Sequence, residues 1–178
     1  MTEIKNYQYE MNVRFADKET SILKAEDFKH FSSLDFFPID SNYRVKAKFS
    51  RTPGETPSMY PTSAGTRFYM LKYGEAQFQL FDKTYQLTVY QTEGLGEEQP
   101  NYLFIPFTDL TSGNETYGGG RYIETNVPKN DELIIDFNKA YNPYCAYNDD
   151  YSCVIPPRSN RLSLEVKAGI KNFTKREH

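Results

Sequence analysis

The chain of 178 residues contains no tryptophan, two cysteines and two histidines. With so few histidines there is little to build a catalytic base from, and the cysteines have no further ligands at zinc spacing. No run of roughly 18 apolar residues occurs, and the first residues lack the apolar core of a signal peptide. We therefore expect a soluble, cytoplasmic protein with no membrane partner, no metal and no predicted cofactor.

Charge of one sign is also lacking, because 24 acidic and 21 basic residues give a net charge of −3. The two signs are interspersed, and the one basic cluster, residues 167–176, is interpreted as a solvated strand and tail. No nucleic acid partner is expected. The oligomeric state does not follow from the sequence.

Aromatic residues are what the chain has in abundance: 15 tyrosines and 13 phenylalanines. Each buries a large area, so a folded core is expected even though hydrophobic residues make up only 38%. The length fits a single domain spanning residues 1–178.

Two short helices are predicted before residue 38. The first has apolar residues at spacings of three and four: Ile4, Tyr7, Met11 and Phe15. The second begins at Ser21, has three apolar residues on one face (Phe28, Phe31 and Leu34), and ends before Pro38. Residues 1–37 are thus expected to form a helical segment that packs on a β domain of residues 43–171.

Strand patterns dominate the rest of the chain. Eight strands are predicted, at residues 43–50, 67–73, 77–81, 85–90, 102–107, 121–125, 133–137 and 161–167. Pro106 indicates an edge or a bulge. Residues 51–65 are rich in proline, glycine, serine and threonine and are long enough for a mobile flap. The fold class expected is mainly β: an antiparallel meander sheet curled into a barrel or sandwich, with two short N-terminal helices.

Residues 109–122 depart from strand periodicity and contain three consecutive glycines, Gly118, Gly119 and Gly120, followed by Arg121. Glycine backbone and a guanidinium together can form a corner that binds an anion. The alternative is a glycine bulge in which Arg121 pairs with an internal carboxylate such as Asp136 or Glu124. This alternative is favoured, because glycines in strands usually mark bulges.

Residues 136–160 form a second irregular segment, with both cysteines, several tyrosines and Asn/Asp side chains. Such loops are usually functional or tied down by their own side chains. Cys145 and Cys153 are eight positions apart, which leaves three interpretations: two packed thiols, a disulfide, or one reactive thiolate. Without a secretion signal, reduced thiols are slightly favoured over the bond.

These segments carry a resemblance to a known family. The resembling stretches are residues 36–38, 43–45, 103–109, 111–113, 116–122, 133–138, 140–143, 145–148, Cys153, 155–157, 160–162 and 168–169. Over residues 28–171 the chain resembles the bacterial family catalogued as domain of unknown function 1684. Two departures are Val154, in place of a proline, and Ile170, in place of a glutamate. The family is uncharacterised, so the resemblance implies no activity, only that the two irregular segments form one joint feature.

We expect this joint feature to be a binding site for a small polar or anionic molecule, and it is also a candidate catalytic site. The expected ligand-binding residues are Tyr117, Gly118, Gly119, Gly120, Arg121, Asn138, Asn142, Tyr144, Cys145 and Asn148. The candidates for proton transfer are Asp109, Glu124, Asp136 and Tyr141. Two alternatives stay open: a non-enzymatic binding module, and a structural plug of hydrogen-bonded loops with no ligand.

Overall fold

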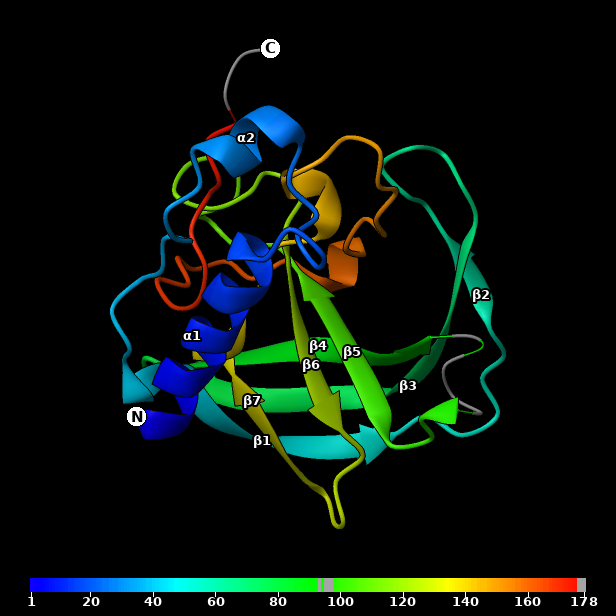
Figure 1. Ribbon diagram of the computed structural model, residues 1–178. Helices are drawn as coiled ribbons and strands as arrows, with labels where there is room; N and C mark the ends of the chain where they lie inside the picture. The colour runs from blue at the N-terminus through cyan, green and yellow to red at the C-terminus, as the bar shows by residue number, and fades with distance from the viewer. Residues whose placement is uncertain (93, 95–97, 176–178) are drawn as a thin grey trace.

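A computed structural model describes residues 1–92, 94 and 98–175 of the chain. Its main element is an antiparallel sheet with the N-terminal helix lying across it (Figure 1). The helices and strands are α1 Thr2–Ala16, α2 Ala25–Lys29, β1 Arg44–Arg51, β2 Ser58–Tyr60, β3 Phe68–Leu80, β4 Lys83–Thr92, β5 Tyr102–Phe107, β6 Arg121–Asn126 and β7 Glu132–Asp136. Four single turns of 3-10 helix complete it: η1 Ser41–Tyr43, η2 Phe137–Lys139, η3 Tyr144–Ala146 and η4 Arg158–Asn160.

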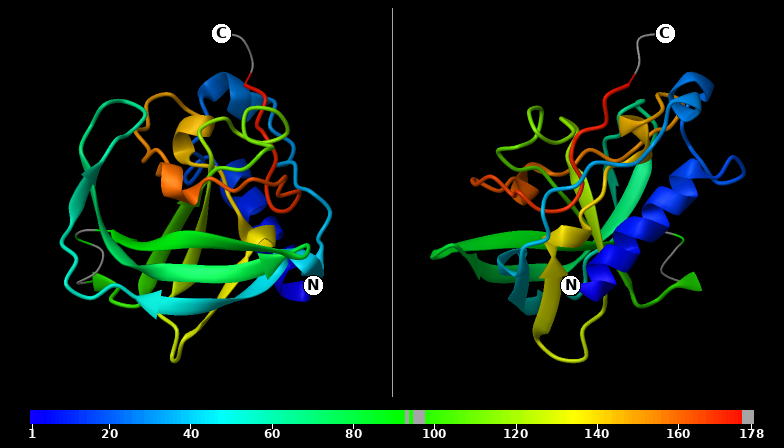
Figure 2. Two further views of the ribbon diagram at one scale, coloured as in Figure 1. Left: turned by 180° about the vertical axis from the view of Figure 1, so that it is seen from behind. Right: turned by 60° about the vertical axis from the view of Figure 1, so that its left-hand side comes forward.

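The sheet has the strand order β6-β5-β4-β3-β1-β7, and β2 pairs with the first part of β3. It curls strongly, so that β5, β6 and β7 run across β1, β3 and β4 (Figures 1 and 2). The two ends of the sheet approach each other, because the Thr125 hydroxyl on β6 donates to the Ile134 carbonyl on β7 at 3.5 Å. The mainly β prediction is confirmed, and the architecture is a half-barrel.

The concave side of the sheet holds the largest apolar core. β1 follows the predicted alternation, with Val45, Ala47 and Phe49 buried and the residues between them exposed. The same core takes Leu103 and Ile105 from β5. Burying one face of each strand fixes its register, since a slip by one residue would expose the apolar set.

Two predicted strands, 67–73 and 77–81, are one strand in the structure. β3 continues through Gly74 with a bulge between Lys72 and Gly74, where we expected a hairpin turn. A Cβ atom at Gly74 would lie 2.5 Å from the Phe49 ring, so the glycine makes room for a core side chain. The pattern was misread because glycine marks close packing as well as turns.

The predicted strand at residues 161–167 is also wrong. Leu162 and Val166 are buried as the alternation indicates, but the segment joins no ladder apart from a bridge between Thr108 and Arg161. Residues 51–65 differ from the expected flap as well, since they contain β2. Beyond β2 the chain is tied to the second irregular segment, with Ser63 N–H donating to the Cys153 carbonyl at 2.9 Å.

The helical prediction holds for α1, whereas α2 is a single turn and not the longer helix expected from Ser21. On α1 only Ile4 and Phe15 are fully buried, and Tyr7 and Met11 are half-buried. The Tyr7 hydroxyl donates to the Lys139 carbonyl at 3.1 Å and so anchors the helix beside η2. Among the described residues, no helix is long and apolar enough to cross a membrane.

Candidate functional site

Arg121 lies in the interior, with an exposed fraction of 0%. Its guanidinium forms a salt bridge to Asp109 Oδ2 at 2.9 Å. It also donates to the carbonyls of Val166, Ala168 and Ile170 at 2.8, 2.5 and 3.1 Å. Burial lowers the pKa of Arg121, and the Asp109 carboxylate opposes that change. The expectation of an anion-binding arginine is therefore not met, because both terminal nitrogens of the guanidinium bind the protein itself. The Nε atom has no hydrogen-bond partner among the described residues, but it is buried and out of reach of an anion from solvent.

The alternative of an internal carboxylate partner describes this corner better, although the glycines form a turn before β6 and not a bulge. The carboxylate that pairs with Arg121 is Asp109 and not Asp136 or Glu124. Asp109 Oδ1 also accepts from the Thr111 amide, the Thr111 hydroxyl and the Val166 amide. With both oxygens engaged and no exposed surface on its side chain, Asp109 is out of reach of a substrate proton.

The glycine run has a packing role next to this ion pair. Gly120 has φ +87°, and a Cβ atom there would lie 2.5 Å from the Phe107 carbonyl and 2.8 Å from Pro156. At Gly119 a Cβ atom would meet the Tyr117 ring at 2.3 Å. Gly118 is exposed beside Gly113. The three glycines thus form a tight turn that delivers Arg121 to the core, and no ligand is needed to explain them.

The predicted asparagines also serve to join distant segments. The Asn138 side chain accepts a hydrogen bond from the Asp40 amide and donates to the Asp40 carbonyl and the Asp136 carboxylate. The same carboxylate also accepts from the backbone amide of Asn138. Asn142 donates to the Lys171 carbonyl at 3.0 Å, and Asn148 donates to the Ile22 carbonyl at 3.1 Å. Each of these side chains makes a hydrogen bond within the protein, although Asn142 Oδ1 has no partner among the described residues. These contacts correspond to the structural-plug alternative for this part of the prediction.

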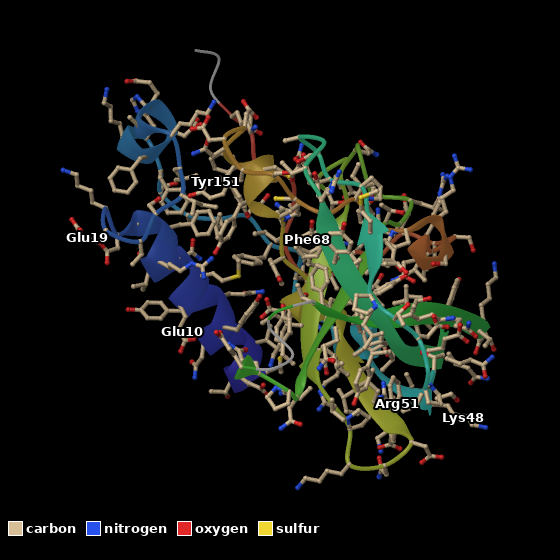
Figure 3. The ribbon with its side chains drawn as sticks, turned by 90° about the vertical axis from the view of Figure 1, so that its right-hand side faces the viewer. Glu10, Glu19, Lys48, Arg51, Phe68 and Tyr151 are labelled. Atoms are coloured by element: carbon tan, nitrogen blue, oxygen red, sulfur yellow. The ribbon has the colours of Figure 1, made fainter. Side chains whose placement is uncertain are left out.

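A pocket of about 390 Å³ nevertheless lies beside the plug, between α1, the β5–β6 hairpin and residues 141–154. Aromatic residues are the most frequent kind in its walls: Tyr7, Phe68, Tyr102, Phe104, Tyr122, Tyr141 and Tyr144. In Figure 3, Phe68 lies on the sheet side of the space next to α1, whereas Glu10 and Glu19 point away from it. The volume falls in the range typical of small-molecule sites. Of the predicted residues, the pocket brings together Glu124, Tyr141 and Tyr144.

Glu124 is the carboxylate of this pocket, and it is exposed to solvent. Its Oε1 atom accepts hydrogen bonds from the Tyr141 hydroxyl at 2.6 Å and from the Tyr102 hydroxyl at 3.1 Å. Burial, and then the nearby Glu124 charge, raise the pKa of both tyrosines, so that each hydroxyl keeps its proton and acts as a donor. Within the described residues, Oε2 of Glu124 accepts no hydrogen bond, so that acceptor is available to a guest.

The opposite charge in the pocket lining belongs to Arg14 on α1. Its guanidinium lies 5.7 Å from the centre of the Tyr144 ring and donates to the Tyr144 hydroxyl at 3.1 Å. Arg14 is exposed. The guanidinium charge is therefore shared between the Tyr144 hydroxyl and solvent.

The cysteines lie next to each other at the edge of the pocket and are both free thiols. Cys153 lines the pocket, and its sulfur accepts a hydrogen bond from the Cys145 amide at 3.3 Å. The Tyr117 hydroxyl lies 3.6 Å from the Cys145 sulfur. Hydrogen bonds from the thiol of Cys153, and then from Tyr117 and Ser63, lower the pKa of Cys145 to about 6 despite partial burial. Of the three interpretations of the cysteines, the disulfide is not formed in this structure.

Sequence reasoning missed much of the pocket lining, including Tyr7 and Arg14 on the helix and Tyr102 and Tyr122 on the strands. A signal was present, because Tyr102 and Phe104, like Tyr122 and Glu124, alternate with core residues along paired strands. The outer face of this hairpin is therefore aromatic where a solvated face would be charged. An aromatic second face indicates that something covers it.

The protein is therefore a half-barrel with α1 across its opening and an aromatic pocket beneath that helix. The family model described as "Protein of unknown function (DUF1684)" matches residues 29–171, and the chain belongs to this family. The chain is also similar to the solution NMR structure of the uncharacterized protein from gene locus rrnAC0354 of Haloarcula marismortui. The identity is 30%, the TM-score is 0.75, and the match covers 96% of this chain and 92% of that one. No curated protein matches the chain. The function therefore has to be argued from the site.

Proposed function

We propose that the pocket binds a small organic amine with an apolar body, and that Glu124 is the counter-charge of its ammonium group. The observation that carries this proposal is the carboxylate of Glu124 among tyrosine rings, with one oxygen held by two hydroxyls and the other oxygen available. Aromatic faces attract cations, and a carboxylate adds a charged hydrogen-bond acceptor.

Two features support binding as the role of the site in preference to proton transfer. A general acid or base works best when its pKa is close to the working pH. Burial moves the pKa of Tyr141 upward, away from neutrality, and Tyr102 is shifted in the same direction. Both hydroxyls instead hold the carboxylate of Glu124 in place, which is the kind of preorganisation that lowers the entropy lost on binding.

The test uses three probes of similar shape and different charge: phenethylamine, phenethyl alcohol and phenylpropionate. Isothermal titration calorimetry with the wild-type protein should give the tightest binding for the amine. Glu124→Gln should weaken amine binding several-fold, because Glu124 is exposed and an exposed ion pair contributes up to about 1 kcal/mol. The same change should leave the binding of phenethyl alcohol nearly unaltered.

Glu132→Gln is the matched control, because Glu132 is a half-exposed carboxylate on β7 that pairs with Lys46 and does not line the pocket. This variant should bind all three probes like the wild type. Tighter binding of phenylpropionate than of phenethylamine would overturn the proposal in favour of an anionic ligand. Equal weakening of amine binding in both glutamine variants would reduce the effect to general electrostatics and would also contradict a site at Glu124.

A further inference from the structure

We propose that Cys145 and Cys153 form a redox-active thiol pair, which a small hydroperoxide converts to a disulfide at the edge of the pocket. The inference does not depend on which ligand the pocket binds. It rests on the position of the two sulfurs, on the polar groups around Cys145 and on the limited access to that residue.

The positions of the two residues suit a disulfide. The Cys153 sulfur lies 3.3 Å from the amide nitrogen of Cys145. Since that nitrogen is one bond from its Cα atom, the sulfur lies within about 5 Å of Cys145 Cα, and adding the length of the Cys153 side chain puts the two Cα atoms within about 8 Å of each other. Disulfides join Cα atoms that are about 4.4–6.8 Å apart, so the bond needs a backbone shift of at most about 1 Å. Cys145 belongs to the single turn η3, and Cys153 lies in an irregular stretch, so neither residue is held inside a long element.

The surroundings distinguish the two thiols. Cys145 Sγ has the Tyr117 hydroxyl at 3.6 Å, and hydrogen bonds from its neighbours favour its thiolate form, with a pKa of about 6. The pKa of Cys153 is shifted upward by its hydrogen bond to Cys145 and by burial. Cys145 is therefore the attacking sulfur, and Cys153 is the thiol that resolves the intermediate. Only 8% of Cys145 is exposed, so a reagent that reaches it has to be small, on the scale of hydrogen peroxide or iodoacetamide.

The reaction has two steps. The Cys145 thiolate attacks one peroxide oxygen, the O–O bond breaks, and the hydroxide that leaves takes up a proton, giving a sulfenic acid at Cys145 and one water. The Cys153 sulfur then loses its proton and attacks the Cys145 sulfur, the S–O bond breaks, and the leaving hydroxide takes up a proton as the second water. Two thiols and one peroxide thus become one disulfide and two waters.

The decisive experiment treats the protein with one equivalent of hydrogen peroxide and analyses it by mass spectrometry. A tryptic fragment, residues 140–158, contains both cysteines. In the wild type this fragment should lose the mass of two hydrogens and regain it on reduction. In Cys153→Ser the sulfenic acid at Cys145 should persist and raise the mass of the fragment by one oxygen. In Cys145→Ser the peroxide should be consumed at least about tenfold more slowly than in the wild type.

Two results would overturn the proposal. One is a Cys145→Ser variant that consumes peroxide as fast as the wild type. The other is a wild-type fragment that gains oxygen at one cysteine and never forms the bond. A measurement that needs no substitution complements them: limiting iodoacetamide at neutral pH should label Cys145 of the wild-type protein before Cys153, and the reverse order would contradict the assigned roles.

Discussion

Replacement of Arg121 by methionine removes the cation from the buried ion pair and keeps an apolar side chain of similar length. Asp109 would keep the amide and hydroxyl of Thr111 and the amide of Val166 as donors, but it would lose the cation with which it forms a salt bridge. The carbonyls of Val166, Ala168 and Ile170 would lose their donor at the same time. The variant therefore leaves a buried charge and buried acceptors without partners.

The expected loss in the free energy of unfolding is about 3–5 kcal/mol, the range for removing one member of a buried salt bridge. This is a large fraction of the roughly 5–15 kcal/mol by which native domains are stable. With a urea m-value of about 2 kcal/mol/M, the midpoint of unfolding should fall by about 2 M. Folding could fail altogether at the upper end of this range.

Urea unfolding followed by circular dichroism measures the loss, with Arg161→Met as the control. Arg161 is exposed, and its replacement should change the free energy of unfolding by less than about 0.5 kcal/mol. Adding Asp109→Asn to Arg121→Met should recover part of the loss, since the uncompensated carboxylate charge is then gone. The reasoning is refuted if Arg121→Met unfolds at the same urea concentration as Arg161→Met, or if the double variant is less stable than Arg121→Met.

Two further predictions concern the neighbouring features. Gly120→Ala should lower the free energy of unfolding by more than Gly54→Ala does. Both glycines have positive φ, but of the two only Gly120 has backbone and side-chain atoms where the Cβ atom would lie. Equal losses in urea unfolding would show that the close packing is irrelevant. The rate at which iodoacetamide alkylates Cys145 should rise with pH as the thiolate forms, and it should be half-maximal near the pKa of about 6. Tyr117→Phe should shift this midpoint upward, because a hydrogen bond to the sulfur is lost. An unchanged midpoint would show that Tyr117 does not stabilise the thiolate.

The sequence was sufficient for elements whose partners are local or whose alternation is regular. β1, β5 and the turn between β6 and β7 lie within a residue or two of the prediction. The strand prediction for residues 161–167 was wrong because alternation indicates burial on one face and does not indicate a neighbouring strand. The hairpin turn predicted at Gly74 was wrong because the role of this glycine depends on the Phe49 ring, which is distant in the sequence.

The candidate site was half predictable for a similar reason. Tyr141, Tyr144 and Glu124 were expected to be functional and do line the pocket. Arg121 was expected to meet an anion, but nothing local indicates that Asp109 and three carbonyls would surround it. The contribution of α1 could not be foreseen either, because Tyr7 and Met11 match the apolar stripe of an ordinary core-facing helix.

The contacts of Arg121 with residues 166–170 also bear on association between chains. The three carbonyls come from alternate residues of a segment that bends at Gly169, where φ is +76°. Unpaired backbone acceptors of this kind are what another strand needs for edge-to-edge pairing. A single internal guanidinium occupies all three and so does the work of a neighbouring strand without offering a new edge. Loss of this side chain would leave these acceptors unpaired inside the core, and a second chain would reach them only after the segment leaves the core. Self-association of such a variant would therefore follow local unfolding.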